Sequence, residues 1–365
     1  MTPADAAQDA AYMRRALDLA RRGWGQTAPN PMVGAVVVRD GQVIAEGWHA
    51  RYGGPHAEAA ALAALPKKGA RDADVYVTLE PCAHHGKTPP CTDALIKAKV
   101  RRVIVAVRDP NPVAAGGIEA LQAAGIEVTV GVETAAAEDL NAPFLFAARR
   151  QDRPFITLKL ALSAEGAVAP AGGARQQWLT GAEARRHVHH LRAGADAILV
   201  GIGTVLADNP ALTVRDAPEP RVPPKRLVLD REARLPLTSQ LVRTARELPV
   251  AVLAERPDPQ RLAALTAAGV EVSVADGLAA HLAALRARGV RHLFAEPGDR
   301  LATALIEGNF VDRLVIFRTP VPLGADALAG VGKVLPPAEG DAAWSVLHEE
   351  RLGTDWLTVY ASASR

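Results

Sequence analysis

The sequence predicts an α/β protein of two domains, and three observations support this. The chain has 365 residues, which is more than a single hydrophobic core usually supports. Hydrophobic residues make up 49% of it but aromatic residues only 4%, a composition that suits helices packed on parallel strands. Short runs rich in Val, Ile and Leu alternate with longer helix-like segments along the chain. A polar, basic stretch near residue 150 predicts the boundary, which gives domains over residues 1–150 and 151–365.

The first half begins with an amphipathic helix, predicted over residues 9–22, that ends at Gly23. A tight turn at residues 39–42 should join two short strands. An alanine-rich helix should start at Pro55 and stop before Pro66. This alternation indicates a parallel or mixed sheet. The strands of this half are predicted at residues 35–38, 43–45, 75–79, 103–107 and 128–130, and two further helices at 91–99 and 118–124.

The second half repeats the alternation and predicts a second α/β domain. Its last two segments, at residues 344–347 and 356–360, should close the sheet as a hairpin. The proline-rich residues 218–224 predict a surface loop. The other strands are predicted at residues 155–160, 197–200, 226–229, 250–253, 270–274, 292–295 and 311–317, and the helices at 182–192, 259–268, 278–288 and 301–307.

The charged residues nearly balance, with 42 basic and 40 acidic residues and a formal net charge of +2. This balance argues against a nucleic-acid or membrane-surface partner. No apolar run is long enough to span a bilayer. The first residues carry an acid at Asp5 and lack the apolar stretch of a secretion signal. We therefore expect a cytoplasmic protein.

Four residues form a possible zinc site, namely His56, Glu58 and the only two cysteines, Cys82 and Cys91. In a cytoplasmic chain, paired cysteines are more often metal-binding or catalytic than a disulfide. His56 and Cys91 are each expected at a helix start, where free N–H groups favour a thiolate. Three protein ligands would leave a fourth zinc position for water, as in catalytic sites. Taken singly, each residue is better explained as a helix cap, a solvated side chain or a buried cysteine, but the four together favour the metal site.

Glu58 indicates what such a site would do. It lies two residues after His56, so it points in a different direction and need not bind metal. A carboxylate beside a zinc-activated water can pass the proton of that water to a leaving nitrogen, which is hydrolytic deamination. A His-x-Glu motif with two cysteines is the known signature of zinc nucleobase deaminases, in which two residues separate the cysteines. Here eight residues separate Cys82 from Cys91, so a loop must bring them together.

Asn30 is a further candidate in this half. Its amide is suited to a hydrogen bond with a pyrimidine edge, but Asn before Pro31 is equally typical of a turn. The sequence favours neither interpretation.

Longer motifs resemble one family, the bifunctional riboflavin-biosynthesis deaminase–reductases. The eight-residue spacer between the cysteines is itself a pattern of that family. The resemblance implies a cytidine-deaminase-like α/β/α domain followed by an α/β domain similar to dihydrofolate reductase. The matching segments span nearly the whole chain and comprise residues 56–58, 80–91, 109–112, 159–163, 177–180 and 201–215.

The resemblance also implies two consecutive reactions. The first domain, with one zinc ion per chain and Glu58 as the catalytic residue, would deaminate a 2,5-diamino-6-ribosylamino-pyrimidinone 5′-phosphate. The second domain would use NADPH to reduce the ribosyl group to ribityl, and a homodimer is expected. The implied cofactor-binding residues are Ala161, Trp178, Thr204, Asp208 and Glu296. The implied substrate-binding residues are Gln176, Arg192, Leu212, Arg215 and again Glu296.

Several positions depart from the family pattern, and two of them leave an alternative open. Glu165 stands where an aspartate is usual, and Pro297 replaces a glycine and so removes one backbone N–H. The alternative is a zinc deaminase with a single function, whose second domain only binds nucleotide or assembles subunits. From the residues alone, the glycines at 201 and 203 are as typical of a plain strand-to-helix turn as of a phosphate loop, because the third glycine of a dinucleotide fingerprint is missing.

A third possibility is a structural protein stabilised by zinc. A closed structural site needs four protein ligands, and His84 or His85 would have to supply the fourth. Such a site has no need of a carboxylate that moves protons, so the enzyme interpretation is favoured.

Overall fold

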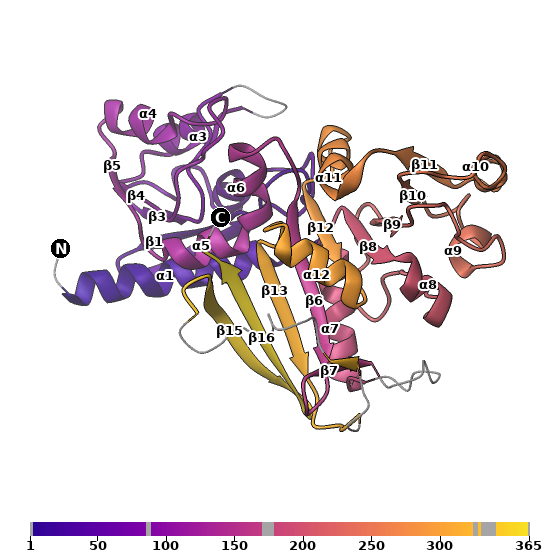
Figure 1. Cartoon of the computed structure of the whole chain (residues 1–365). Helices are drawn as coiled ribbons and strands as arrows, with labels where there is room; N and C mark the ends of the chain where they lie inside the picture. Colours follow the sequence, from indigo (N-terminus) through magenta and orange to yellow (C-terminus); the bar gives the residue numbers. More distant parts are fainter. Residues whose placement is uncertain (1–2, 85–88, 170–178, 324–327, 330–340, 364–365) are drawn as a thin grey trace. The chain divides into compact units, whose positions relative to one another are not determined.

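The computed structural model describes residues 3–84, 89–169, 179–323, 328–329 and 341–363. It divides the chain into two compact units, Met1–Arg150 and Gln151–Arg365 (Figure 1). Each unit has its own sheet and its own hydrophobic core, and each is described by itself.

The first unit is built on a five-stranded mixed sheet with the strand order β2-β1-β3-β4-β5. The strand pairs β3·β4 and β4·β5 are parallel, whereas β1 runs antiparallel to both of its neighbours. The loops that follow β3 and β4 therefore leave the sheet at the same edge. The strands are β1 (Gly34–Arg39), β2 (Gln42–Trp48), β3 (Asp74–Val77), β4 (Arg102–Val105) and β5 (Glu127–Val130).

Three helices cover each face of this sheet, because alternate strand side chains point to opposite faces. Val36 packs with Met13 and Leu17 of the first helix, whereas Val37 on the other face packs with Ala57 and Ala61. One face carries α1 (Pro3–Arg21), α5 (Thr134–Leu140) and α6 (Ala142–Arg149), and the other carries α2 (Ala57–Ala63), α3 (Cys91–Ala98) and α4 (Gly117–Ala123).

The second unit contains a nine-stranded sheet with the order β11-β10-β9-β8-β12-β6-β13-β16-β15. All pairs from β11 to β13 are parallel, and β16 and β15 complete the sheet as an antiparallel hairpin. The strands are β6 (Phe155–Leu162), β8 (Ala197–Gly201), β9 (Lys225–Leu229), β10 (Val250–Ala254), β11 (Glu271–Val274), β12 (His292–Ala295), β13 (Arg313–Arg318), β15 (Trp344–Leu352) and β16 (Asp355–Ser362), with the small pair β7 (Ala167–Ala169) and β14 (Leu328–Ala329) beside them.

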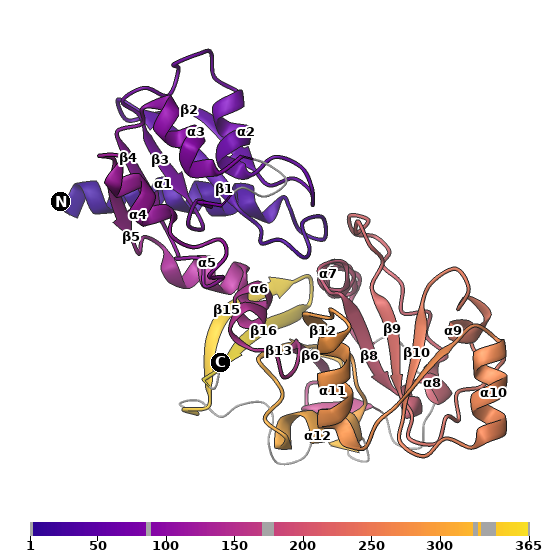
Figure 2. The same cartoon turned by 90° about the horizontal axis from the view of Figure 1, so that it is seen from above.

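Helices also cover both faces of the second sheet (Figure 2). One face carries α11 (Gly277–Ala287) and α12 (Asp299–Glu307), and the other carries α7 (Ala182–Ala193), α8 (Ile202–Asp208), α9 (Gln240–Arg243) and α10 (Pro259–Ala267). The predicted α/β class with two sheets is therefore confirmed.

Several helices of the structure were predicted too short or not predicted at all. The first helix begins at Pro3, six residues before the predicted start, and the stretch near residue 150 continues a helix, α6, through Arg149. Leu145 and Phe146 of α6 are buried, so its apolar side supports the helix although its end is polar. The short helices α5, α8 and α9 were not predicted, since each buries only one or two residues and so gives little periodic signal.

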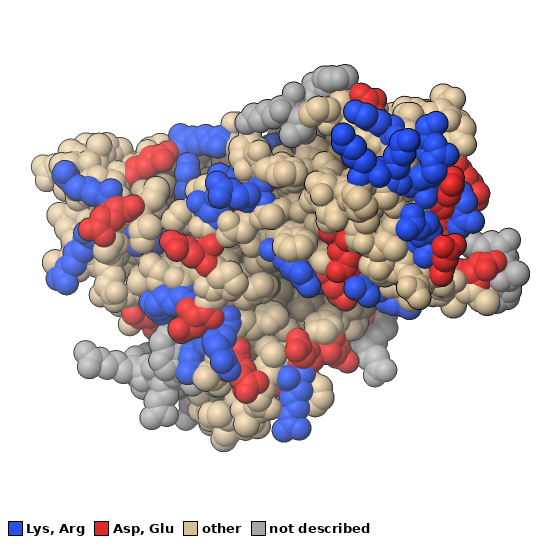
Figure 3. Space-filling view, turned by 180° about the vertical axis from the view of Figure 1, so that it is seen from behind, with Lys and Arg blue, Asp and Glu red and all other residues tan. Residues whose placement is uncertain are grey.

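The charged side chains are mixed in sign over much of the face in Figure 3, with basic side chains gathered in one area beside acidic ones. None of the described helices combines the length and the apolar character needed to cross a membrane.

His292 should make the second unit sensitive to acid. It is buried at the start of β12, where its ring bonds the Gly194 carbonyl at 3.1 Å and the Thr157 hydroxyl at 2.9 Å. Burial lowers the pKa of His292 to about 4. As the pH falls from about 6.5 toward this value, the unfolded chain binds a proton that the folded chain does not. This residue should then cost the folded unit roughly 3 kcal/mol.

We predict that His292→Gln, whose amide does not titrate, loses stability less steeply over this pH range than the wild type. Hydrogen–deuterium exchange of peptides from β6 and β12, corrected for the intrinsic rate, measures the difference. Equal pH slopes in the two proteins would contradict the assignment.

Candidate active sites

His56, Cys82 and Cys91 converge in the first unit. His56 is the residue before α2, Cys82 follows β3, and Cys91 is the first residue of α3. The Nδ1 atom of His56 lies 3.6 Å from Sγ of Cys82 and 3.4 Å from Sγ of Cys91. Among the residues that the structure describes, these three form the one group with metal-binding side chains this close, with all ligand atoms within 4.8 Å. The loop therefore brings the two cysteines together, as the spacing required.

Two glycines allow the backbone to come this close. A Cβ atom at Gly47 of β2 would lie 2.4 Å from the Ala57 carbonyl oxygen, so glycine lets α2 and His56 sit directly on the sheet. A Cβ at Gly117 would lie 1.8 Å from the Pro81 carbonyl oxygen. Glycine at the start of α4 thus leaves room for the segment that carries Cys82.

A buried carboxylate holds the loops around the cluster. Glu80 precedes Pro81 and Cys82, and its Oε1 atom accepts hydrogen bonds from the N–H groups of Gly116 (3.1 Å) and Ile118 (3.2 Å). Its Oε2 atom accepts from the Asp109 N–H at 3.1 Å. A buried carboxylate is stable only with such partners. Glu80 therefore fixes the end of β3 against the loops that follow β4.

The three ligand side chains fit a soft divalent cation. The Cys91 N–H donates to Sγ of Cys82 at 3.4 Å. Hydrogen bonds with the Cys91 thiol and with His56 together lower the pKa of Cys82 to about 4, against the effect of burial. The pKa of Cys91 is raised by its hydrogen bond to Cys82 and by burial. By themselves the two sulfurs share a single negative charge, and a zinc ion between them would stabilise both thiolates.

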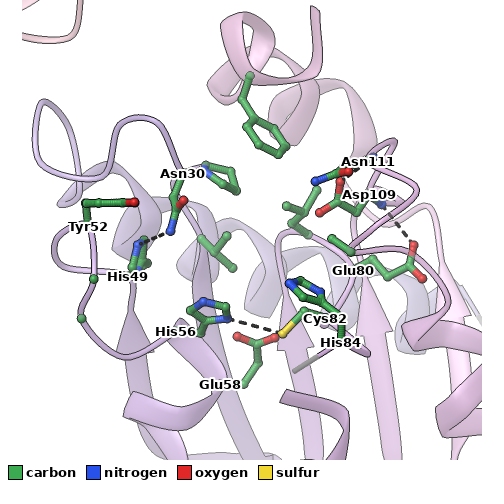
Figure 4. Close-up of a pocket in the computed structure, with 17 residues that line it drawn as sticks. Asn30, His49, Tyr52, His56, Glu58, Glu80, Cys82, His84, Asp109 and Asn111 are labelled. Carbon is green, nitrogen blue, oxygen red and sulfur yellow. Dashed lines mark hydrogen bonds between the residues drawn. The ribbon is translucent and has the colours of Figure 1, made fainter. Parts of the chain in front are cut away.

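Glu58 lies in the first turn of α2 beside this cluster (Figure 4). Its side chain is buried at 3% exposure, and burial raises the pKa of its carboxyl group. A carboxyl group with a raised pKa takes up a proton more readily and can return it to a leaving group. The geometry thus combines a metal-binding group with a separate proton carrier.

A pocket of about 320 Å³ adjoins the cluster, which is within the range of small-molecule sites. Figure 4 shows Asn30 and Tyr52 on one side of it and Asp109 and Asn111 on the other. His49 lies next to Asn30 and is hydrogen-bonded to the Pro55 carbonyl. The pocket is lined by Asn30, Pro31, Val33, His49, Tyr52, Gly53, Gly54, His56, Glu58, Leu79, Glu80, Cys82, His84, Asp109, Asn111, Ala114 and Phe144.

The orientation of Asn30 is fixed by His49. Nδ1 of His49 lies 2.9 Å from the Pro55 carbonyl and donates to it, so its Nε2 accepts from the Asn30 amide nitrogen at 3.3 Å. Burial lowers the pKa of His49 and keeps the ring neutral. The turn and the binding interpretation of Asn30 are thus compatible, because it follows a turn and also lines the pocket.

No role was predicted from the sequence for two residues that line the pocket, Asp109 and Asn111. Both belong to the segment 109–112, and the resemblance of this segment to the family is the feature of the sequence that points to them. Asp109 accepts a hydrogen bond from the Asn111 N–H at 2.9 Å, and burial raises the pKa of its carboxyl group. Asn111 in turn accepts from the Val113 N–H at 3.1 Å, so both side chains are oriented by their own loop.

His84 lines the pocket but is not part of the ligand cluster, and His85 lies outside the described residues. The part of the chain that the structure describes therefore offers three protein ligands, which does not favour a closed structural site.

In the second unit, the predicted residues follow neighbouring parallel strands. Ala161 is near the end of β6, Thr204 and Asp208 lie on α8 directly after β8, and Glu296 directly follows β12. The strands are adjacent in the order β8-β12-β6, so these residues gather at the carboxyl edge of one sheet, where α/β proteins bind ligands. Gln176 and Trp178 lie outside the described residues.

An ion pair between Arg192 and Glu296 lies at this edge of the sheet. Arg192, in the last turn of α7, donates to both carboxylate oxygens of Glu296 at 2.5 and 3.0 Å, and to the Thr213 carbonyl at 2.9 Å. Burial would raise the pKa of Glu296, but Arg192 and the nearby Lys159 lower it overall. Burial lowers the pKa of Lys159. Arg192 is thus largely occupied by protein groups, whereas Arg215 is exposed.

Family models match both units. The model of the cytidine and deoxycytidylate deaminase zinc-binding region matches residues 6–107. The model of the RibD C-terminal domain matches residues 154–358, more than half of the chain. The chain belongs to the RibD family of riboflavin biosynthesis proteins. The resemblance predicted from the motifs is confirmed, and the presence of both domains favours the bifunctional enzyme over the alternative with a single function.

Similar RibD proteins cover nearly the same length. The riboflavin biosynthesis protein RibD of Aquifex aeolicus is 43% identical over 87% of this chain and 88% of its own. That of Escherichia coli is 42% identical over 88% of this chain and 90% of its own. The solved structure of Acinetobacter baumannii RibD has a TM-score of 0.82 at 37% identity and covers 98% of this chain and 99% of its own.

A structure from Thermotoga maritima, described as a diaminohydroxyphosphoribosylaminopyrimidine deaminase/5-amino-6-(5-phosphoribosylamino)uracil reductase, has a TM-score of 0.83 at 34% identity. It covers 98% of this chain and 100% of its own. RibD enzymes combine a zinc-binding deaminase domain with a reductase domain that binds NADPH.

We predict one zinc ion per chain, bound by the cluster. Cys82→Ala should reduce the zinc content to near zero, because two protein ligands hold the metal far more weakly than three. Inductively coupled plasma mass spectrometry of the purified chain measures this. The matched control is His84→Asn, which changes a pocket side chain outside the cluster and should keep the zinc. Loss of zinc from the control would instead indicate a fourth protein ligand.

Proposed function

We propose that this chain catalyses two consecutive steps of riboflavin biosynthesis. The first unit deaminates 2,5-diamino-6-ribosylamino-4(3H)-pyrimidinone 5′-phosphate, and the second reduces the ribosyl side chain of the product to ribityl with NADPH. The observation that carries the proposal is the convergence of His56, Cys82 and Cys91 with the buried Glu58 on one pocket. A structural zinc site would not need that carboxylate.

In the deamination, water replaces the amino group on the pyrimidine ring and ammonia leaves. Zinc, when bound by the three ligands, supplies the positive charge that activates the water. Glu58 accepts the proton of the water and passes it to the nitrogen that leaves, so the carboxylate is regenerated. Asn30, oriented by His49, binds the edge of the ring.

Glu58→Gln should abolish ammonia release, because the amide keeps the size of the side chain but accepts no proton. General acid–base groups contribute about 100- to 10,000-fold to rate, and we expect a loss at the upper end of that range. Ammonia release is measured by a coupled assay, with the zinc content as the control for an intact site. Substantial ammonia release from a variant that still binds zinc would contradict the role of Glu58.

In the reduction, NADPH, when bound, would supply a hydride to the anomeric carbon of the ribosyl group, while the bond from that carbon to the ring oxygen breaks and the oxygen takes a proton from water. Ala161, Thr204, Asp208 and Trp178 are proposed to bind the cofactor, with Glu296 shared between cofactor and substrate. Thr204 lies beside the start of α12, since a Cβ at Gly298 would be 3.6 Å from its Oγ1 atom. Pro297 precedes this helix start, so the first N–H groups of α12 remain suited to a phosphate.

The substrate is proposed to contact Gln176, Arg192, Leu212 and Arg215. Arg192 already pairs with Glu296, so it organises the site by holding this carboxylate. Arg215 is exposed, with one hydrogen bond from its Nη1 atom to the Thr213 hydroxyl at 3.2 Å. We assign the phosphate of the substrate chiefly to Arg215, whose guanidinium group suits bidentate binding.

Arg215→Ala should impair ribosyl reduction and leave deamination unchanged. A hydrogen bond to a charged group is worth about 1.5–3 kcal/mol, which corresponds to roughly 10- to 150-fold in kcat/KM. The reduction is followed by NADPH absorbance and the deamination by ammonia release. Arg231→Ala is the matched control, since Arg231 is an exposed arginine of the same unit that pairs with Glu255. Equal losses of both activities would contradict separate sites.

We further infer a homodimer that acts in the cytoplasm on this small phosphorylated pyrimidine. The homodimer rests on the family resemblance, and light scattering of the purified chain should give the mass of two chains. A mass of one chain at micromolar concentration would contradict it.

A further inference from the structure

The segment 209–216 after α8 has no regular secondary structure, yet it carries two proposed substrate residues, Leu212 and Arg215. Three of its non-glycine residues have positive φ angles, namely Asn209 (42°), Leu212 (50°) and Asp216 (51°). L-residues rarely adopt this backbone conformation, and it persists only where the surroundings hold it. Side chains from other elements must therefore fix the segment.

The beginning of the segment is held from β9 and α9. Gln240 donates two hydrogen bonds to Asn209, from its backbone N–H to the side-chain oxygen at 2.8 Å and from its side-chain amide to the carbonyl at 2.7 Å. The buried guanidinium of Arg226 donates to the Ala211 carbonyl at 3.2 Å. These contacts hold the segment before Leu212, so other groups must hold the residues that follow it.

The end of the segment is held by one face of α7. His189 and Arg192 are three residues apart and so lie on the same side of this helix. Arg192 donates to the Thr213 carbonyl at 2.9 Å. The backbone N–H of Arg215 donates to Nδ1 of His189 at 3.0 Å. The helix thus fixes two backbone groups immediately around the proposed phosphate-binding residue.

We propose that His189 is a positioning residue of the reductase site, which fixes the backbone of Arg215 and so directs its guanidinium to the substrate phosphate. The inference rests on the proposed reductase function and deepens it. An N–H donor needs a lone pair on Nδ1, so the ring must be neutral with its hydrogen on Nε2. A protonated ring would present a second donor to the Arg215 N–H and release it.

The surroundings of His189 keep the ring neutral. Burial lowers the pKa of His189, and the neighbouring charges of Arg192 and Arg215 lower it further, while Glu296 and the Thr213 backbone act in the opposite direction. The net effect is a pKa below the ordinary value, so the contact to Arg215 is intact at neutral pH and is lost on the acid side.

The test compares His189→Ala with His189→Asn in the full-length chain. The oxygen of Asn can occupy the position of Nδ1 and accept the same N–H, but it does not titrate. The substrate is 5-amino-6-(5-phosphoribosylamino)uracil, and NADPH absorbance is followed well above the ordinary histidine pKa of about 6.5. His189→Ala should raise KM about fivefold, the factor of one net hydrogen bond, with little change in kcat. His189→Asn should restore KM.

Two further measurements separate positioning from a merely structural role. As the pH is lowered, KM should rise more steeply for the wild type than for His189→Asn. The substrate phosphate titrates in the same way with both proteins, so the difference between their slopes reports His189 alone. In an Arg215→Ala background, His189→Ala should have almost no additional effect on KM, because it acts through Arg215. His190→Ala is the control, since its ring faces His187 on the same helix, and it should keep the wild-type KM.

An unchanged KM in His189→Ala, a failure of His189→Asn to restore it, or additive effects with Arg215→Ala would each overturn the assignment. A wild-type chain that does not oxidise NADPH with this substrate would refute the proposed reductase itself, which distinguishes the two failures.

Discussion

The three hydrogen bonds that Glu80 accepts from backbone N–H groups hold the first active site together. Glu80 lies in the segment that follows β3. Its partners belong to the loops and the helix that follow β4, and they are Asp109, Gly116 and Ile118. The same carboxylate therefore fixes the chain that leads to Cys82 and the loop that turns Asp109 toward the pocket. Removing a partner from a buried carboxylate costs several kcal/mol, so this arrangement resists distortion. The metal ligands and the pocket wall depend on it together.

The second site is also held by a mostly buried charged group, but through different contacts. In both units, functional side chains leave the sheet where neighbouring parallel strands end, and short loops bring them together. In the second unit the Arg192–Glu296 pair takes the place of the buried carboxylate, since it joins α7, β12 and the segment 209–216. Each site thus depends on a mostly buried carboxylate, Glu80 or Glu296, whose hydrogen-bond partners come from other elements.

The sequence could predict the metal site because few residue types bind zinc and the chain has only two cysteines. It also located most strands, whose β-branched runs are buried on both faces. It could not reveal the positive φ of Leu212 or the pairing of Arg192 with Glu296, because both depend on contacts between segments far apart in the chain. The glycines at 201 and 203 left two interpretations open, and the structure has a strand-to-helix turn there, with α8 beginning at Ile202.

We propose that deamination and reduction are separate reactions of one chain, in that order. An experiment that supplies the full-length protein with the diaminopyrimidine ribosyl phosphate, first without and then with NADPH, tests this when ammonia and the products are followed by mass spectrometry. We expect ammonia release without NADPH and accumulation of the deaminated ribosyl compound, which is converted to the ribityl compound once NADPH is added. Ammonia release that requires NADPH, or a ribosyl compound that persists in its presence, would contradict this order of reactions.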